Sequence, residues 1–436
     1  MQDIRNLVYL SLISCIENER FSNLEADSQI ARSELNYRDR AFYTAFFYGV
    51  IEKQITLDHQ IKKLSKTPIE KLQTKALVIL RMGLYQLLYM NSIPDHAAIN
   101  ETVALAKIKL NRGAVGYING MLRSAQRELK GENGEIKLFV PDKDRDVCGY
   151  LSITYSFPRY LCKLWVNAYG TAAAERIMQA QNERNITTIQ VNTLKTDRSA
   201  YLKRINELGL SAEASSVSDS GIHLVGNAPI TSLPDFDNGY FFVQDDSSRL
   251  CVEMLGAKEG ETVLDACACP GGKSFGSAIK MNNKGRIFSC DLHESKLSLI
   301  KSGANRLGIN IIEAYHADSA VFKSEWLNKF DRVLCDVPCS GFGTVSKKPD
   351  LRLKKSDTLN ELVGIQLSIV NNCSKYVKNG GTLVYSTCTL NPAENEENVK
   401  KFLEQNPNFE LVEMKTNFPY ENNYDGFFFA KMIKKL

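Results

Sequence analysis

Short strand-like segments alternate with helix-forming segments from about residue 240 to the end of the chain. The strand-like segments are apolar, β-branched runs that each end in an acidic residue or a cysteine: TVLDAC (262–267), RIFSCD (286–291), IIEAYHAD (311–318), FDRVLCD (330–336) and GTLVYSTC (381–388). Amphipathic segments such as ESKLSLIKSGANRLG separate them. This alternation predicts a mostly parallel, doubly wound α/β sheet that binds its ligands at the carboxyl ends of the strands.

The first 130 residues carry apolar side chains at helical spacing and no alternating strand pattern, so we expect an all-helical domain. The segment 76–90 is apolar on nearly every side, which predicts a central buried helix that ends before Pro94. A further helix is expected to begin near Asn100, and a last one to run from about 116 to 129.

A polar, glycine-bearing stretch at 131–146 separates this helical part from a middle region. The middle region contains helix-like material, the β-branched run NITTIQVNTL, an expected helix at about 197–209 and two short expected strands near 211–225. We therefore expect a multidomain chain with three parts: a helical domain at 1–140, a small α+β region at 141–238, and an α/β domain at 239–436.

Composition is that of a soluble globular protein, with 44% hydrophobic and 24% charged residues. The apolar stretch at the N-terminus is too short for a signal peptide or a membrane span, so we expect a cytoplasmic protein without a membrane partner. Eleven cysteines in such a chain are expected to be reduced. No CxxC pair occurs and only five histidines are present, so we expect no metal site.

The net charge of +4 resides in the first 140 residues, where 19 Lys and Arg face 15 Asp and Glu. Within 61–130 the ratio is 12 to 4. Such an excess on helices is typical of a surface that binds phosphate groups. A merely well-solvated helical surface accounts for the charge equally well, and both readings stay open at this point.

The segment VLDACACPGGKS (263–274) predicts a strand, an acidic residue and a glycine-rich turn into a helix. It has neither the GxGxxG nor the GxxxxGK[ST] spacing, so NAD and ATP are poor matches, although the glycines could also serve only to turn the chain. Acidic residues follow the neighbouring strands, which suits a cationic nucleoside without phosphates, such as S-adenosylmethionine. The candidate cofactor residues are Cys267, Ala268, Cys269, Pro270, Gly271, Gly272, Lys273, Asp291, Asp318 and Asp336.

Two cysteines, Cys339 in DVPCSGFG and Cys388 in STCTLNPAENEEN, follow two strands that are expected to be neighbours. A thiolate that adds to carbon 6 of cytosine makes carbon 5 nucleophilic enough to take a methyl group. A cation such as Lys273 would favour the thiolate, and Asp336 could hold a proton at N3 of the base. A single cysteine is more often a small buried apolar residue than a nucleophile, but this paired context favours catalysis.

ACACPGGKS, DVPCSGFG, YSTCTLNPAENEENV and DGFFFAKM resemble the successive motifs of the RNA cytosine-C5 methyltransferases, over about 240–436. The resemblance implies a class I, Rossmann-like fold that uses S-adenosylmethionine. It also implies that Cys388 is the nucleophile and that Cys339 assists product release. Because DNA cytosine methyltransferases use the Pro-Cys thiol instead, a swap of these two roles is the main mechanistic alternative.

Upstream, YRDRAFYTAFFYGVIEK, LRMGLYQLLYMNSIPDHAAINETVALAK and GYINGMLRSAQRE look like a NusB-type helical domain. Together with the catalytic motifs they resemble the bacterial small-subunit (16S) rRNA cytosine-C5 methyltransferases of the RsmB (Fmu/Sun) family. The resemblance implies ribosomal RNA as the partner and an RNA-binding role for the basic helices, and we expect a monomer. The alternatives are the same chemistry on tRNA or large-subunit rRNA, and a non-catalytic RNA-binding factor of ribosome assembly.

The chain departs from the family pattern at four places. Cys269 replaces an alanine of the cofactor loop, a small-for-small change. Phe157 stands where a histidine is common, and Gln190 where an arginine is typical; if that arginine touches RNA, its loss would weaken binding by about 1 to 3 kcal/mol or shift the target. KKPDLR replaces a segment richer in Arg and His, and we expect Lys347 and Lys348 still to meet phosphate.

Overall fold

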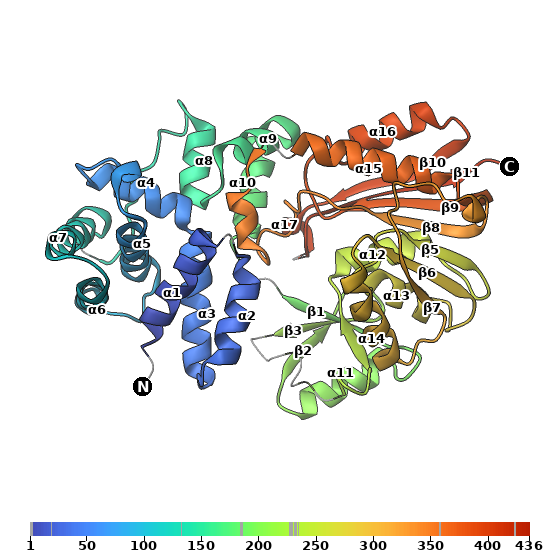
Figure 1. Cartoon of the computed structure of the whole chain (residues 1–436), viewed down its shortest axis with the longest axis horizontal. Helices are drawn as coiled ribbons and strands as arrows, with labels where there is room; N and C mark the ends of the chain where they lie inside the picture. The colour runs from blue at the N-terminus through green and yellow to red at the C-terminus, as the bar shows by residue number, and fades with distance from the viewer. Residues whose placement is uncertain are drawn as a thin grey trace. The chain divides into compact units, whose positions relative to one another are not determined.

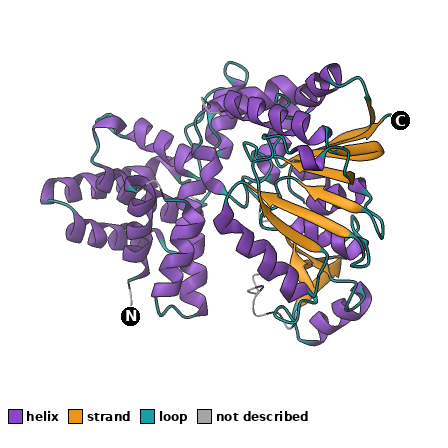
Figure 2. Cartoon of the chain, turned by 45° about the vertical axis from the view of Figure 1, so that its right-hand side comes forward, coloured by secondary structure: helices purple, strands orange, loops and turns teal. Residues whose placement is uncertain are grey.

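A computed structural model of the chain describes the residues 3–18, 20–131, 133–183, 186–225, 230, 233, 235–356, 359–422 and 424–436. By its contacts the chain forms two compact units. The helical unit comprises 1–182 together with 347–354, and the α/β unit comprises 183–346 and 355–436. The secondary structure divides accordingly, with helices in the first unit and all of the extended sheets in the second (Figure 2).

The helical unit follows the order of the chain from α1 to α10 (Figure 1). Its elements are α1 (Ile4–Glu17), α2 (Ser22–Arg32), α3 (Tyr37–Glu52), α4 (Gln54–Leu64), η1 (Ile69–Lys71), α5 (Thr74–Tyr89), α6 (Asp95–Lys109), α7 (Arg112–Leu129), α8 (Val147–Tyr155), α9 (Arg159–Tyr169) and α10 (Thr171–Ala180). Helix α5 buries eleven of its 16 residues, which confirms the predicted central helix. Among the described residues, no helix is long and apolar enough to cross a membrane.

Helix α6 begins at Asp95, so the predicted start near Asn100 is wrong by about one and a half turns. Pro94, which was expected only to end the preceding helix, also leads directly into the next one with its fixed φ of −60°. Asp95 lies in the first turn, where a carboxylate is favoured by the helix dipole, and it forms an ion pair with Lys130 at 2.5 Å.

The segment 347–354, which contains η5 (Pro349–Leu353), belongs to the helical unit, although 346 and 355 belong to the other. Its Arg352 is only 2% exposed. The guanidinium lies 4.2 Å from the centre of the Phe157 ring. It donates to four oxygens near the ends of α8 and α10: the carbonyls of Tyr155, Ser156 and Gln181 and the side chain of Asn182. The buried Phe157 thus forms the apolar side of an arginine site, while Lys347 and Lys348 are exposed.

The α/β unit is built on a seven-stranded sheet of order β10-β11-β9-β8-β5-β6-β7. Strands β9, β8, β5, β6 and β7 are parallel, which confirms the predicted mostly parallel sheet. The bounds are β5 (Thr262–Asp265), β6 (Arg286–Asp291), β7 (Ile312–His316), β8 (Phe330–Asp336), β9 (Val377–Thr387), β10 (Phe409–Asn417) and β11 (Phe427–Lys434). The helices are α12 (Asp246–Leu255), α13 (Gly272–Lys280), α14 (Leu297–Leu307), α15 (Leu359–Ser374), α16 (Glu396–Gln405) and α17 (Pro419–Asn422), with η3 (Glu294–Lys296) and η4 (Ser324–Trp326).

The antiparallel strands β10 and β11 were not predicted as part of the sheet. Strand β10 is an edge strand whose charged residues and exposed face hide the apolar signal of a strand, as is usual at protected sheet edges. Strand β9 also begins earlier than predicted, at Val377 rather than Gly381. The segment up to Asn379 was expected to be helical, whereas α15 ends at Ser374. The residues before Gly381 instead form an irregularity in the pairing of β9 with β8, in which Gly380 has a φ of 73°.

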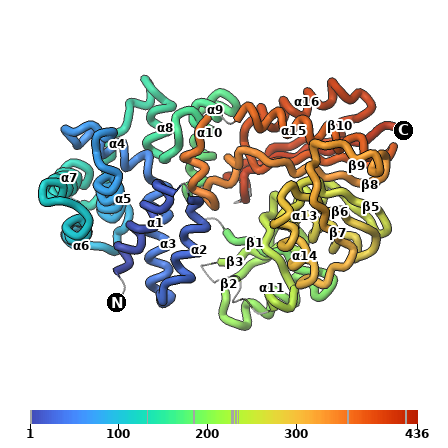
Figure 3. Tube along the Cα trace, in the orientation of Figure 1, coloured from blue at the N-terminus to red at the C-terminus, as the bar shows by residue number. Residues whose placement is uncertain are grey.

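The same unit contains a smaller antiparallel sheet of order β2-β3-β1-β4. Its elements are β1 (Thr187–Val191), α11 (Arg198–Glu207), β2 (Ser211–Ala214), β3 (Gly221–Val225) and β4 (Phe241–Val243). Strands β2 and β3 lie beside α11 in the green part of the trace (Figure 3). Gln190 on β1 is fully buried and donates to Asp246 at 3.2 Å. The polar contacts of Gln190 therefore lie inside the small sheet, with Asp246, Ser218 and Ser220.

Replacing Arg352 by alanine removes the donors from four oxygens around α8 and α10. We expect the free energy of local unfolding of these helices to fall by about 3 kcal/mol, because buried acceptors that lose their donors are costly. Amide hydrogen exchange of α8 and α10 in the full chain measures this. The exposed Arg112→Ala should change protection by less than about 0.5 kcal/mol. Equal protection in both variants would contradict the anchoring role of Arg352.

Candidate active site

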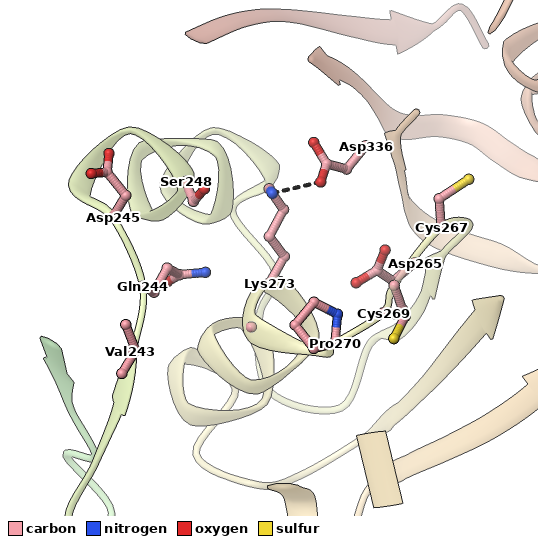
Figure 4. A pocket seen from close by; sticks show the side chains of 12 residues that line it. Val243, Gln244, Asp245, Ser248, Asp265, Cys267, Cys269, Pro270, Lys273 and Asp336 are labelled. Atoms are coloured by element: carbon pink, nitrogen blue, oxygen red, sulfur yellow. Dashed lines mark hydrogen bonds and ion pairs between the residues drawn. The ribbon is translucent and has the colours of Figure 1, made fainter. Parts of the chain in front are cut away.

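A pocket of about 520 Å³, open to solvent, lies at the carboxyl ends of β5 and β8 (Figure 4). Three stretches of chain line it: the end of β4 with the start of α12, the loop after β5, and the end of β8. The lining residues are Val243, Gln244, Asp245, Ser248, Asp265, Cys267, Ala268, Cys269, Pro270, Gly272, Lys273 and Asp336.

The glycine-rich loop turns sharply into α13. Gly271 has a φ of 113°, a conformation that favours glycine, and a Cβ atom there would lie 2.5 Å from the ring of Phe275. Gly272 begins α13 and lines the pocket, so the backbone can come close to a ligand at this point. Gly271 itself does not line the pocket but shapes the loop that does.

Lys273 donates to Asp336 at 2.6 Å across the pocket (Figure 4). Ser386 donates to the other carboxylate oxygen of Asp336 at 2.8 Å. Burial alone would lower the pKa of Lys273, but the Asp336 carboxylate outweighs burial and holds the pKa above its usual value. Lys273 is therefore a cation, and its ammonium also lies 5.3 Å from the centre of the Phe427 ring. Since Ser386 belongs to β9, this network connects the pocket to the next strand.

Two buried oxygens of the pocket have no hydrogen bond within the described part of the chain: Asp265 Oδ1 and Gln244 Oε1. Asp265 Oδ2 accepts from Ser274 at 2.6 Å. Burial is the main cause that raises the pKa of Asp265 to about 6. Both open oxygens are acceptors, and the single lysine of the pocket is already neutralised by Asp336. The residues therefore fit a ligand that brings hydrogen-bond donors and positive charge, and they do not fit a phosphate.

Besides Gly271, two of the predicted cofactor residues, Asp291 and Asp318, lie outside the pocket lining. Asp291 ends β6 and accepts from the backbone N–H of His293 at 2.8 Å. Asp318 follows β7, is exposed, and accepts from the backbone N–H of Ala320 at 2.9 Å. Both lie at carboxyl ends of strands, as expected, but each carboxylate is used to stabilise its own turn.

Cys339 and Cys388 are half-buried, and their sulfur atoms lie 3.2 Å apart. The strands that precede them are paired in parallel, with Asp336 opposite Ser386, so the two loops leave the sheet side by side. The hydrogen bond to the Cys388 sulfur raises the pKa of Cys339 well above its usual value, and burial and the charges of Glu394 and Asp336 add to this. Cys339 is thus a thiol that can donate to its neighbour. Cys388 also packs against the apolar cluster that contains Ala268 of the cofactor loop.

Sequence reasoning missed Val243, Gln244, Asp245 and Ser248, which form one wall of the pocket. They lie where β4 leads into α12, and β4 is only three residues long. The signal was available in QDDSS, because Asp245 caps α12 by accepting from the N–H of Ser247, the pattern of a helix start after a strand.

Comparison with known proteins agrees with this arrangement. Over 453 residues the chain is 38% identical to the probable ribosomal RNA small subunit methyltransferase B of Bacillus subtilis, covering 99% of both chains. The chain belongs to the RsmB/F family of 16S rRNA methyltransferases. The corresponding protein of Synechocystis is 34% identical over the whole length of both chains. The crystal structure of PH0851 has the same fold, with a TM-score of 0.81, 24% identity, and 99% of this chain and 98% of that chain covered.

Models of three families divide this methyltransferase in chain order. The NusB family matches residues 2–127, a ferredoxin-like domain of RsmF/B-like methyltransferases matches 157–231, and the 16S rRNA methyltransferase RsmB/F model matches 252–433. The resemblance stated from the sequence motifs is confirmed, as is the predicted fold: a NusB-like helical N-terminus, a small α+β middle and a Rossmann-like methyltransferase domain. The middle region is identified more closely, as ferredoxin-like.

The raised pKa of Asp265 predicts a pH-dependent stability. Because the folded protein takes up this proton near pH 6 whereas an exposed Asp does so near 3.8, protonation stabilises the fold. The contribution is fully present below about pH 4 and is lost as the pH rises through 6. Asp265→Asn should lack this loss, so its free energy of unfolding relative to wild type should rise by about 2 to 3 kcal/mol between pH 4 and 7.

Urea unfolding of the full chain at several pH values measures this difference. The exposed Asp219→Asn, in the same unit, is the control and should follow wild type. A difference between Asp265→Asn and wild type that does not change between pH 4 and 7 would contradict the assignment of the titration to Asp265.

Proposed function

We propose that this methyltransferase transfers a methyl group from S-adenosylmethionine to carbon 5 of a cytosine in 16S ribosomal RNA through a covalent adduct of Cys388. The observation that carries the proposal is the pair of thiols 3.2 Å apart beside a pocket of acidic character. Direct methylation of an oxygen or an exocyclic nitrogen needs no thiol. Methylation of a pyrimidine carbon needs one thiolate and a second group that removes a proton.

The residues of the pocket would hold S-adenosylmethionine by its polar ends. Gln244 and Asp265 offer open acceptor oxygens, and the backbone of Gly272 allows close approach. Asp336 and Asp265 give the pocket the negative charge that suits a cationic ligand. The cofactor supplies the methyl group as an electrophilic sulfonium. Asp291 and Asp318 are proposed to accept hydrogen bonds from the ribose hydroxyls, because they lie at the carboxyl ends of the next two strands, β6 and β7.

The chain's own residues then act in order. The Cys388 thiolate forms a bond to carbon 6, and the electron pair of the carbon 5–carbon 6 double bond moves toward carbon 5. N3 takes up a proton from solvent, and the Asp336 carboxylate accepts a hydrogen bond from this N3–H. The hydrogen bond from Cys339 stabilises the thiolate before attack. After carbon 5 has gained the methyl group, N3 returns its proton to solvent. Cys339 gives its own proton to solvent once the Cys388 thiolate is consumed, and as a thiolate it then accepts the proton from carbon 5. The released electron pair re-forms the double bond, and the bond between Cys388 and carbon 6 breaks.

Lys273 is proposed to act through Asp336 rather than on a cysteine directly. The ion pair at 2.6 Å keeps the carboxylate in place at the end of β8, between the pocket and the two thiols. This differs from the role first expected of Lys273, which was to favour a thiolate, because its ammonium donates to Asp336. The basic helices of the NusB-like domain are proposed to bind the RNA backbone, together with Lys347 and Lys348.

Replacing Cys388 by alanine should lower methyl transfer more than a thousandfold, since the nucleophile is lost, while S-adenosylmethionine still binds. Transfer of a labelled methyl group to 16S rRNA, with calorimetric titration of the cofactor, measures both effects. Cys148→Ala, in a half-buried helical position, is the matched control and should keep full activity. Undiminished turnover of Cys388→Ala would remove this residue as the nucleophile.

Replacing Cys339 by alanine should leave the attack possible but block release. A protein-RNA adduct should then accumulate and run as a slow band on a denaturing gel. The double variant Cys339→Ala/Cys388→Ala should give no such band, because nothing remains to attack carbon 6. Normal release of methylated RNA by Cys339→Ala would overturn its assigned role, and an adduct in the double variant would overturn that of Cys388.

A further inference from the structure

A fully buried carboxylate, Glu394, lies behind the two thiols. Its Oε2 accepts from the backbone N–H of Ser340 at 2.8 Å and from Gln366 at 2.9 Å. Its Oε1 accepts from Asn391 at 2.9 Å. These three donors are uncharged, so the carboxylate is held by directed hydrogen bonds rather than by a neighbouring cation. The free-energy cost of removing this carboxylate from water is therefore offset by these three hydrogen bonds.

The contacts of Glu394 join the two cysteine loops. Ser340 directly follows Cys339, and Asn391 lies three residues after Cys388. Gln366 on α15 completes the arrangement, because it also donates to the carbonyl of Pro338, on the other side of Cys339. Both neighbours of Cys339 are thereby fixed to one carboxylate that is anchored in the Cys388 loop.

Two further contacts support the same junction. The hydroxyl groups of Ser340 and Thr389 lie 2.6 Å apart, and the backbone N–H of Gly343 donates to the carbonyl of Cys388 at 2.9 Å. A Cβ atom at Gly343 would lie 1.8 Å from the carbonyl oxygen of Gly426, so the loop is packed too closely for any other residue. The separation of the two sulfur atoms is thus set by contacts on several sides.

We propose that Glu394 is a positioning residue that holds Cys339 against Cys388 and so makes the release step possible. The inference rests on the proposed function for its catalytic consequence, but the position and reactivity of the thiols can be measured without RNA. Glu394 does not touch the substrate in this account. It acts through Ser340 and Asn391 on the two residues that do.

The negative charge of Glu394 has a second effect on the pair. The titratable groups around Cys339 are Cys388, Glu394, Asp336 at the end of β8 and Tyr385 on β9. The cation of Lys273 is bound to Asp336. The hydrogen bond to Cys388 and burial are the main causes that raise the pKa of Cys339, and negative charges at Glu394 and Asp336 add to them. Cys339 therefore remains a hydrogen-bond donor to Cys388 until the reaction has consumed the Cys388 thiolate.

The test is Glu394→Gln in the full chain. The variant keeps the size of the side chain, but its amide group presents N–H donors to a site where Ser340, Gln366 and Asn391 already donate. We expect the loop that carries Cys339 to be held less tightly, and the negative charge of Glu394 is lost. Alkylation of Cys339 by iodoacetamide, followed by peptide mass spectrometry over a range of pH, should accelerate roughly tenfold at a given pH, the equivalent of one pKa unit.

The matched control is Glu396→Gln, two residues further on, where the carboxylate accepts from Thr416 on β10 instead. It should alkylate as wild type does. Should Glu394→Gln fail to fold, Thr389→Val removes the bond to Ser340 without touching Glu394 and should accelerate alkylation of Cys339 in the same direction. If Glu394→Gln folds and its Cys339 is alkylated at the wild-type rate, the inference is overturned. If Glu394→Gln does not fold, a wild-type rate in Thr389→Val overturns it.

Kinetics separate this inference from the proposed function. With 16S rRNA, Glu394→Gln should lower kcat, leave KM for S-adenosylmethionine unchanged and accumulate the slow-running adduct, whereas a merely destabilised protein would lose both parameters together. If Cys339 is alkylated faster in Glu394→Gln but Cys339→Ala accumulates no protein-RNA adduct, the positioning role holds and the covalent mechanism is rejected. A loss of activity in Glu394→Gln without faster alkylation would reject the positioning role alone.

Discussion

The parallel pairing of β8 with β9 is the constraint on which the rest of the site depends. Because side chains and strand ends of parallel neighbours lie in register, Asp336 and Ser386 end their strands together and share a hydrogen bond of 2.8 Å. The loops that follow these strands therefore start side by side, and the sulfur atoms of Cys339 and Cys388 lie 3.2 Å apart. A shift in this pairing would separate the thiols and would also move Asp336 away from Lys273.

Charge in the site is arranged in two layers. Toward the pocket, Lys273 neutralises Asp336, and Asp265 keeps an open oxygen for a ligand. Toward the interior, the Glu394 carboxylate lies behind the cysteine loops and accepts hydrogen bonds from neutral donors. Interactions between charges are stronger in such partly buried surroundings than in water. Asp336 therefore belongs to both arrangements: it lines the pocket, and its charge adds to the hydrogen bond and the burial that raise the pKa of Cys339.

Much of this could be predicted from the sequence because the signals are local. The parallel strands contain short apolar runs, such as VLC in β8 and LVY in β9, and β6 and β8 have the predicted bounds. What could not be predicted depends on distant contacts. Strand β10 is charged and exposed, and it forms only by pairing with β11. Asp291 follows the expected strand, yet its carboxylate turns back to the N–H of His293, which spacing along the chain does not reveal.

Contacts across the sequence also explain residues that appeared to be departures. Phe157 is not a lost polar contact but the apolar face of the buried Arg352 site, 195 residues further along the chain. Gln190 lies inside the small sheet, where Asp246 and two serines bind its amide group. In both cases the partner lies too far along the chain for a sequence pattern to identify it. Glu394 belongs to the same class, since its partners come from three separate segments.

The central claim is that Cys388, held beside Cys339, bonds to carbon 6 of a cytosine. Its most direct test is to incubate the wild-type protein with S-adenosylmethionine and 16S rRNA in which cytidine is replaced by 5-fluorocytidine, since fluorine at carbon 5 cannot leave as a proton does. Peptide mass spectrometry then locates the trapped nucleotide. The account predicts a methylated 5-fluorocytidine bound to the peptide of Cys388. A nucleotide bound to Cys339, or methylated RNA with no protein attached, would contradict it.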